Sequence, residues 1–266
     1  MAACDDNNIR IFDYKTGEFL ESPLSLRFEP DFICLTPDSK SFLTSGRSSN
    51  VSVIRSFDVE TYTPLSTYSR QARTLVFLDN DTFVSSSGSP NVYVFNVNNN
   101  EPLHSINLEH TDQYILTVMS PIMFLIGSSN SIKSFEYTNN EWVCTSTFNG
   151  HSKEISSLTK VNESLFVSTS FDKTAKLWDI NKNLQCIFTF LGHKSSIFSS
   201  IFLKEEKAIV TGDENGNIFL WSIETYLETN QQEDETQNKV TGTQQNQNIV
   251  NHGTGDQGPI TTVVEP

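Results

Sequence analysis

Short apolar runs separated by polar turns fill the middle of this chain, and their alternation predicts β-strands. The clearest set comprises four runs of β-branched, aromatic and aliphatic residues, at 155–161, 164–170, 175–180 and 186–191. Large apolar and smaller side chains alternate along each run, which places successive residues on opposite faces of a strand. Four such strands make a small antiparallel sheet, which must stack on neighbours to bury both of its faces.

The same stretch occurs twice. The first copy opens with Gly150-His151 and closes with Trp178-Asp179, and the second runs from Gly192-His193 to Trp221-Ser222. The two Gly-His pairs lie 42 residues apart and the two tryptophans 43 apart. A period of about 40–45 residues between such end markers resembles the blades of the WD-repeat β-propeller family. That resemblance implies circular stacking of the sheets, which covers both faces of every blade and leaves little exposed edge.

Weaker copies extend the pattern towards the N-terminus. An aromatic residue closes the third strand of each copy, at Phe12, Phe57, Phe95, Phe135, Trp178 and Trp221. The gaps between these residues are 45, 38, 40, 43 and 43. The sequence therefore predicts an all-β chain, a WD40 β-propeller of about six recognisable four-stranded blades.

The resemblance also implies a buried polar network in a complete blade. In the first full copy this network would join His151, Asp172 and Trp178 to either Ser168 or Ser170. Each buried polar group needs a partner, and the aspartate would fix the tautomer of the histidine. A histidine beside an aspartate and serines could also form a hydrolase triad. The set recurs with the repeat period and lacks a nucleophile elbow, which favours a structural role.

The other copies carry less of this set. His193 and Trp221 are present in the second copy, but Asn215 occupies the turn position, so we expect an incomplete network there. Three earlier copies lack a clear Gly-His pair and a turn aspartate. We expect the packing of phenylalanine side chains to replace the network in those copies.

The pattern divides the chain into three parts. Residues 1–227 form the predicted propeller, which begins with what looks like the second strand of a blade. Residues 228–258 are rich in Gln, Asn and Glu, which predicts a disordered insertion. Residues 259–266 look like a first strand. That strand either closes the N-terminal blade, giving six blades, or starts a further repeat of a longer protein, and both interpretations stay open.

Composition and charge exclude some classes of function. The formal net charge is −14, of which residues 224–266 contribute −6, and an acidic body argues against direct nucleic-acid binding. We expect no signal peptide, and the most apolar stretch, Tyr114–Gly127, is too short to span a bilayer. The four cysteines have neither metal-binding nor redox spacing. We expect an intracellular protein, cytoplasmic or nuclear, with no cofactor, metal, membrane or small-molecule substrate.

These observations predict a non-catalytic scaffold that mediates protein–protein interactions within an intracellular multiprotein complex. Other proteins would contact the top face of the propeller through Asp5, Phe171 and Glu214, which stand just before the turn acid or its equivalent. An exposed aromatic such as Phe171 is a common hot-spot residue. The alternative is that Phe171 packs on a neighbouring blade and that the two acids are solvated turn residues.

Two narrower interpretations stay open beside an enzymatic one. Short stretches at Ser87–Val92 and Tyr137–Trp142 resemble the tandem-propeller WD subunits of the small-subunit processome, a ribosome-biogenesis assembly, which would place the chain in the nucleolus. A substrate-recognition propeller of a ubiquitin ligase would need an F-box or similar adaptor helix, and none is visible. A propeller hydrolase would need converging carboxylates or metal ligands, and the sequence offers no clustered set.

Overall fold

The structure, a computed structural model, is nearly all β. It describes residues 2–4, 8–11, 13, 15–18, 24–26, 28–48, 51–68, 72, 74–86, 89–108, 115–182 and 186–227. The chain divides into two compact units, Met1–Trp221 and Ser222–Pro266. The described part of the second unit includes a four-residue helical turn at 224–227. The predicted insertion at 228–258 and the predicted strand at 259–266 lie outside the described residues, as do Asp5 and Phe12.

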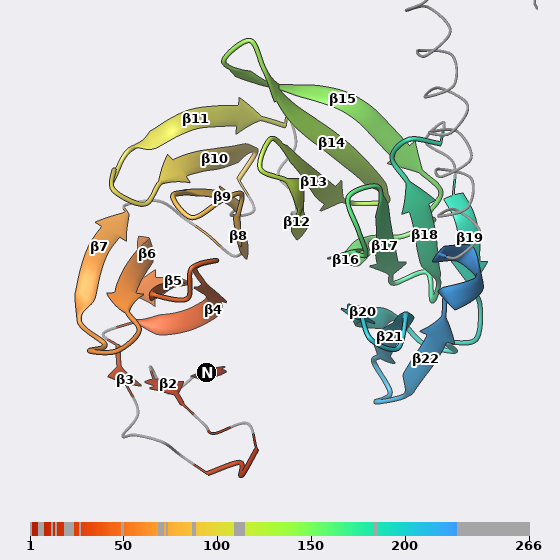
Figure 1. The fold of residues 1–266 in the computed structure, drawn as a ribbon, viewed down its shortest axis with the longest axis horizontal. Coiled ribbons are helices and arrows are strands. Elements are labelled where there is room, and N and C mark those ends of the chain that lie inside the picture. The colour runs from red at the N-terminus through yellow and green to blue at the C-terminus, as the bar shows by residue number, and fades with distance from the viewer. Residues whose placement is uncertain are drawn as a thin grey trace, which may run out of the picture. The chain divides into compact units, whose positions relative to one another are not determined.

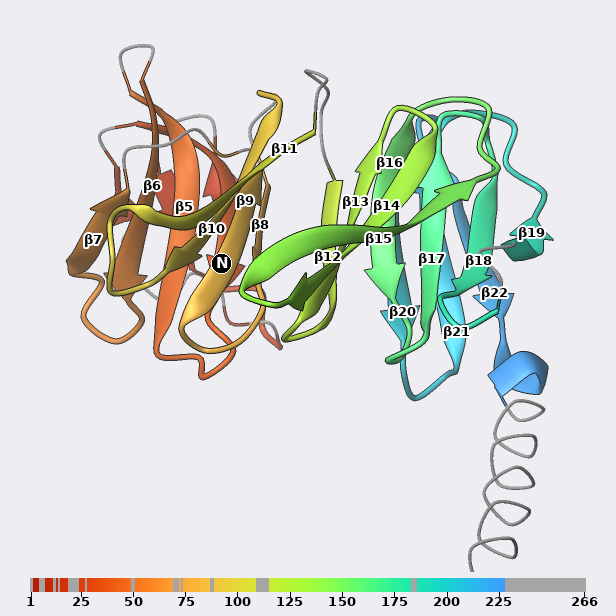
Figure 2. The same cartoon turned by 90° about the horizontal axis from the view of Figure 1, so that it is seen from above.

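Strands that follow one another along the chain pair into antiparallel sheets, six in the described part (Figures 1 and 2). Sheet 1 contains β1 (Ala2–Cys4), β2 (Asn8–Arg10) and β3 (Leu24–Ser25). Sheet 2 contains β4 (Glu29–Leu35), β5 (Ser41–Ser48), β6 (Val51–Asp58) and β7 (Pro64–Tyr68). Sheet 3 contains β8 (Thr74–Phe77), β9 (Thr82–Ser86), β10 (Asn91–Asn96) and β11 (Pro102–Asn107).

The remaining sheets follow the same order. Sheet 4 contains β12 (Ile115–Ser120), β13 (Met123–Ser128), β14 (Ser131–Thr138) and β15 (Glu141–Asn149). Sheet 5 contains β16 (Ile155–Lys160), β17 (Leu165–Ser170), β18 (Ala175–Asp179) and β19 (Cys186–Phe190). Sheet 6 contains β20 (Ile197–Leu203), β21 (Ala208–Asp213) and β22 (Ile218–Ser222). The prediction of an all-β chain of about six blades is confirmed. Among the described residues, sheets 1 and 6 each contain three strands, and the other four sheets each contain four.

An aromatic pair on the second and third strands stabilises each of sheets 2 to 5. The two rings of each pair stand directly opposite one another in the strand register: Phe42–Phe57, Phe83–Phe95, Phe124–Phe135 and Phe166–Trp178. Their ring centroids lie 5.1–6.2 Å apart at interplanar angles of 10–13°. Stacked cross-strand rings of this kind add to the stability that their buried area provides.

Neighbouring sheets bury each other's faces. Strand β12 contacts β8 and β16, and β16 contacts β20, so the first strands of these consecutive sheets lie side by side. Between sheets 4 and 5, Leu125 and Ile132 form one buried cluster with Phe166 and Trp178. One sheet thus supplies aliphatic side chains and the next supplies its aromatic pair. This mutual burial explains how such narrow sheets remain stable.

The acid that follows a closing aromatic shapes the turn into the fourth strand. Asp58 Oδ1 accepts hydrogen bonds from the amides of Glu60 and Thr61, at 3.0 and 2.7 Å. Asp179 Oδ1 accepts from the amide of Asn181 at 2.8 Å. A short acidic side chain that bonds to the backbone two or three residues further on favours a turn. The aspartate of the Trp-Asp pair therefore has a local structural role.

Every fourth strand of sheets 2 to 5 changes register beside the closing aromatic. The pairing of β7, β11, β15 and β19 with the third strand shifts immediately before Phe57, Phe95, Phe135 and Trp178. One residue of the fourth strand, such as Leu65 or Leu103, is then left without a partner opposite it, which is a β-bulge. Both leucines project into solvent, at 57% and 49% exposure.

Candidate functional site

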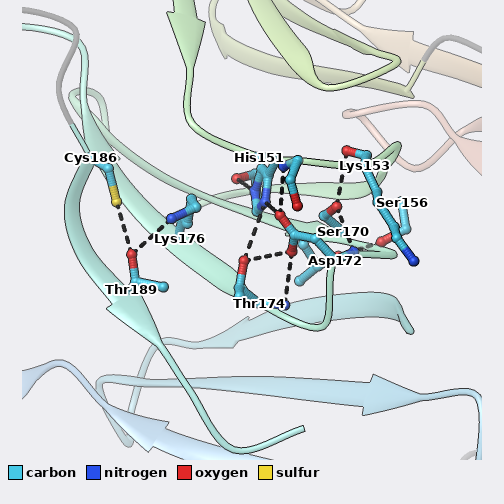
Figure 3. Close-up of polar contacts among 12 residues, drawn as sticks. His151, Lys153, Ser156, Ser170, Asp172, Thr174, Lys176, Cys186 and Thr189 are labelled. Carbon is cyan, nitrogen blue, oxygen red and sulfur yellow. Dashed lines mark hydrogen bonds and ion pairs between the residues drawn. The ribbon is translucent and has the colours of Figure 1, made fainter. Parts of the chain in front are cut away.

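His151 links the loop after β15 to the middle strands of sheet 5 (Figure 3). Its Nδ1 atom lies 2.8 Å from Asp172 Oδ2, and its Nε2 atom lies 2.7 Å from Ser168 Oγ. The indole Nε1 of Trp178 donates to the same Ser168 Oγ at 2.8 Å. Side chains from a loop, a turn and two strands therefore form one continuous chain of hydrogen bonds.

The donors and acceptors in this network run in one direction. An indole N–H can only donate, so Ser168 Oγ accepts from Trp178 and has its own hydrogen available for His151 Nε2. His151 Nε2 is then the bare nitrogen, and the protonated Nδ1 donates to Asp172. The network therefore selects one neutral tautomer of His151.

The carboxylate of Asp172 is held by several further donors. Its Oδ2 atom accepts from the amide of Ser152 at 3.0 Å, and its Oδ1 atom accepts from the hydroxyl of Thr174 at 2.6 Å (Figure 3). Burial alone would raise the pKa of Asp172, but the bonds from Thr174, Ser152 and His151 outweigh it and lower the pKa. Burial lowers the pKa of His151 by more than Asp172 raises it. A neutral imidazole beside a carboxylate is therefore the favoured state near neutral pH.

The order Asp172, His151, Ser168 is also the order of a hydrolase triad. A nucleophilic serine must reach its substrate, however, and Ser168 is 0% exposed. Its oxygen also accepts the Trp178 indole hydrogen bond. The geometry therefore supports a structural role for this set of residues.

Ser170, the other candidate serine, lies in a different set of contacts (Figure 3). Its hydroxyl donates to the carbonyl of Lys153 at 3.1 Å and accepts from the amide of Asp172 at 3.0 Å. Ser168 is thus the residue that joins His151 to Trp178. Ser170 instead fixes the turn that carries Asp172.

The glycine of each Gly-His pair has a steric explanation. A Cβ atom on Gly150 would lie 3.0 Å from Trp178 Cη2, and one on Gly192 would lie 3.0 Å from Trp221 Cη2. Favourable carbon–carbon contacts are about 3.5–4.0 Å. A side chain at either position would displace the tryptophan. The close approach of the loop to the indole therefore requires glycine.

Sheet 6 contains a second network of the same kind. His193 Nδ1 lies 2.8 Å from Asp213 Oδ2, and His193 Nε2 lies 2.7 Å from Thr211 Oγ1. The indole of Trp221 donates to Thr211 Oγ1 at 2.8 Å. The expectation of an incomplete network at this position is wrong, because Asp213 supplies the carboxylate that Asn215 lacks.

The position of the acid explains why sequence reasoning missed it. Asp172 lies six residues before its tryptophan and projects from the turn, whereas Asp213 lies eight residues before Trp221, at the end of β21. The role of Thr211 is predictable from the sequence, because it precedes Trp221 by ten residues, just as Ser168 precedes Trp178. Burial would raise the pKa of Asp213, but hydrogen bonds from His193 and Asn217 outweigh it and lower the pKa.

The candidate contact residue Phe171 packs on the next sheet. It lies in the turn after β17, and its ring contacts Phe198 of β20, with centroids 5.3 Å apart and planes at 65°. Phe198 is 51% exposed. Glu214 is exposed in the equivalent turn of sheet 6, where its amide donates to the carbonyl of Ser196 at 2.9 Å. Asp5, the third candidate, lies outside the described residues.

Phe198 is the residue that sequence reasoning missed in this region. It follows Ile197 directly, and a strand cannot bury two successive side chains on the same face. The pairing of β20 with β21 shifts between Ile197 and Ser199, so Phe198 occupies a β-bulge. Ile197 is buried while the ring of Phe198 is half exposed against Phe171.

Comparison with known families identifies the repeat. The family model described as WD domain, G-beta repeat matches residues 142–179 and 184–222. The chain carries WD40 repeats. Each matched WD40 repeat spans the fourth strand of one sheet and the first three strands of the next, from β15 to β18 and from β19 to β22. The His151 and His193 networks each lie within one such repeat.

The chain is also similar to parts of several curated proteins. It is 35% identical over 78 residues to Periodic tryptophan protein 2 of Saccharomyces cerevisiae, covering 28% of this chain and 8% of that protein. It is 45% identical over 56 residues to the Denticleless protein homolog of Danio rerio, covering 21% and 8%. It is 33% identical over 78 residues to the guanine nucleotide-binding protein subunit beta of Oryza sativa subsp. japonica, covering 29% and 20%. The matched segments thus span one fifth or less of these relatives.

The described ranges contain neither a candidate membrane span nor a candidate metal site. No helix within them is long and apolar enough to cross a membrane. No group of three or more His, Cys, Asp and Glu side chains in the same ranges could hold a metal ion.

Proposed function

We propose that this chain is a non-catalytic scaffold that holds other proteins within an intracellular assembly. WD40 repeats are generally protein-interaction modules, and the chain carries two matched copies. One of the similar proteins is, by its name, the beta subunit of a guanine nucleotide-binding protein, and thus part of an assembly. The proposed contact surface consists of the turns that carry Phe171 and Glu214 together with Phe198 at the start of β20.

The observation that carries this proposal is the ring pair of Phe171 and Phe198. The rings of Phe171 and Phe198 pack edge to face, and half of the surface of Phe198 is exposed to solvent. Aromatic residues fixed in this way lose little conformational freedom on binding, and they are common hot spots of protein interfaces. Lys153, Lys173 and Glu214 are exposed on the same loops and turns and would form a polar rim.

The proposal has a narrower form, a subunit of the small-subunit processome in ribosome biogenesis. The short stretches Ser87–Val92 and Tyr137–Trp142 favour it over the alternative, a substrate-recognition propeller of a ubiquitin ligase. Either form would use the same exposed aromatic surface. The two forms differ in the proteins that the surface would retain.

The test is an affinity pull-down from cell extract with the intact chain, read by quantitative mass spectrometry. Phe198→Ala is the test variant, and Phe188→Ala is the matched control. Phe188 is exposed to a similar extent, 55%, but it lies on β19, outside the proposed contact surface. We expect a defined set of proteins that Phe198→Ala loses by about tenfold or more and that Phe188→Ala retains. Nucleolar ribosome-assembly proteins in that set would select the processome form, and ligase subunits would select the other.

Equal retention of every protein by the intact chain and by Phe198→Ala would refute this contact surface. Circular dichroism of each variant excludes a loss of fold as the cause. Turnover of a substrate by the purified chain, abolished in Ser168→Ala, would contradict the non-catalytic role.

A further inference from the structure

The long hairpin of β14 and β15 ends in a tight turn that fixes an aromatic pair (Figure 1). The turn consists of Asn139 and Asn140, whose φ angles are 52° and 66°. Two successive residues in the left-handed region are typical of the two-residue turns that match the twist of a hairpin. Tyr137 and Trp142, on either side of the turn, stand directly opposite one another, with ring centroids 5.2 Å apart.

Sheet 3 supports one face of this hairpin. The ring of His104 on β11 meets the ring of Tyr137 edge-on, with centroids 5.4 Å apart. The ring of Trp142 lies 4.7 Å from that of Phe124 and packs on the buried cluster that sheets 3 and 4 share. Both Tyr137 and Trp142 are only partly buried. The rings are therefore held in place, while part of each remains accessible to a partner.

The other face of the hairpin carries carboxylates beside an exposed valine. β15 is an edge strand of sheet 4, and its residues Glu141 and Val143 are exposed, Val143 at 44%. Glu136 stands opposite Val143 in the strand register and shares its face. Because successive residues of a strand point to opposite faces, a segment lying along this edge can contact Trp142 on one face and the two glutamates on the other. We call Glu136, Tyr137, Glu141, Trp142 and Val143 the hairpin edge.

The turns around the hairpin edge are acidic. Within sheet 3, the amide of Val97 donates to the carbonyl of Asp81 at 2.7 Å, which joins two turns on the side of His104. The turn segments of sheets 3 and 4 at this end together contain five acids and no lysine or arginine, at 78–82, 96–104, 120–123 and 136–143. The matching turns of sheets 2, 5 and 6 contain Lys40, Lys182 and Lys204.

We propose that the hairpin edge binds an extended, arginine-rich segment of another protein. Guanidinium groups pair with carboxylates and stack on aromatic rings, and this edge offers both. The aliphatic stems of the arginines would cover Val143. Charge disfavours the other occupants, because a second copy of the chain carries −14 and residues 224–266 of the same chain carry −6. Nucleic acids would be repelled for the same reason.

The test is fluorescence anisotropy of labelled octa-arginine and octa-lysine peptides titrated with the full chain at about 0.15 M salt. An acidic chain attracts any polycation, so the variants must separate this edge from net charge. The test variant is Glu136→Gln with Glu141→Gln. The matched control is Glu205→Gln with Glu206→Gln, which removes two charges from exposed residues after β20. Neither pair removes a buried side chain, so both should keep the circular dichroism spectrum of the wild type.

We expect octa-arginine to bind about threefold or more tightly than octa-lysine, since guanidinium stacks on aromatic rings better than ammonium does. The test variant should weaken octa-arginine binding about tenfold, and the control less than about twofold. Trp142→Leu should abolish the preference for arginine over lysine. Phe198→Ala, which alters the contact surface proposed above, should bind octa-arginine like the wild type.

Equal weakening by the two glutamine pairs would show that net charge alone attracts the peptide, which overturns the proposal. Equal affinity of the wild type for the two peptides overturns the role of the rings. No measurable binding of octa-arginine, or a loss of binding in Phe198→Ala as large as in the test variant, also overturns the assignment to the hairpin edge.

Discussion

Replacing Trp178 with alanine should lower the free energy of unfolding by about 3–5 kcal/mol, because the change removes a large buried ring and leaves a cavity. The side chain of Trp178 is 0% exposed. It stacks on Phe166, with ring centroids 6.2 Å apart, and meets Phe148 edge-on at 5.8 Å. Its position between sheets 4 and 5 means that the cavity would weaken the contact between two sheets.

A second substitution separates packing from hydrogen bonding. Trp178→Phe retains a ring that can stack on Phe166 but has no N–H to donate to Ser168. The hydroxyl of Ser168 can still bond to His151, so we expect a smaller loss of about 1–2 kcal/mol. The difference between the alanine and phenylalanine variants then measures the contribution of the buried ring.

The measurement is urea unfolding followed by far-ultraviolet circular dichroism, with the midpoint converted to free energy at a common slope. Trp142→Ala is the matched control, since Trp142 is only partly buried although it packs 4.7 Å from Phe124. Trp142→Ala should cost less than Trp178→Ala. A loss below about 1 kcal/mol for Trp178→Ala, within the range of ordinary surface substitutions, would refute the role assigned to this residue.

Two more predictions concern the network. Ser168→Ala leaves His151 Nε2 and Trp178 Nε1 without a partner and should cost about 2 kcal/mol, read from the urea midpoint with Ser170→Ala as comparison. Folding lowers the pKa of His151 below its ordinary value of 6.5 and that of Asp172 below 3.8. Each group therefore adds to the free energy of unfolding at pH values above its ordinary pKa, and this contribution is lost as the pH falls through the lowered pKa. Stability should therefore fall as the pH drops below about 6.5, and fall further below 3.8. His151→Gln should flatten the first decrease in urea midpoints measured against pH, and an unchanged profile would contradict the assignment.

The spacing of aromatic residues is enough to predict the third strands. Each third strand carries one closing aromatic, because each repeat must place one large ring at the same point of the stack. In chain order these are Phe57 on β6, Phe95 on β10, Phe135 on β14, Trp178 on β18 and Trp221 on β22. The partner rings on the second strands were not predicted. Their distance from the closing aromatic is 15 residues for Phe42 but 11 for Phe124, since the turn between the strands varies in length.

The network in sheet 6 shows why spacing alone fails at a polar site. A carboxylate can reach the histidine from the turn, as Asp172 does, or from the strand end, as Asp213 does. Counted back from the tryptophan, these two positions differ by two residues. Residues two apart on a strand point to the same face, so a side chain at either position can reach the histidine. Only the three-dimensional arrangement shows which acid is used. Likewise, the exposure of Phe198 depends on a bulge that the apolar pattern does not reveal.

The register shifts in the fourth strands have a consequence for solubility. A growing aggregate adds strands to an edge whose amides and carbonyls form an unbroken ladder. In sheets 2 to 5 the bulge beside each closing aromatic interrupts the outer strand and strengthens its twist. An incoming strand would find a matching partner for a few residues at most. The bulge beside each closing aromatic therefore protects four strand edges from templating aggregation.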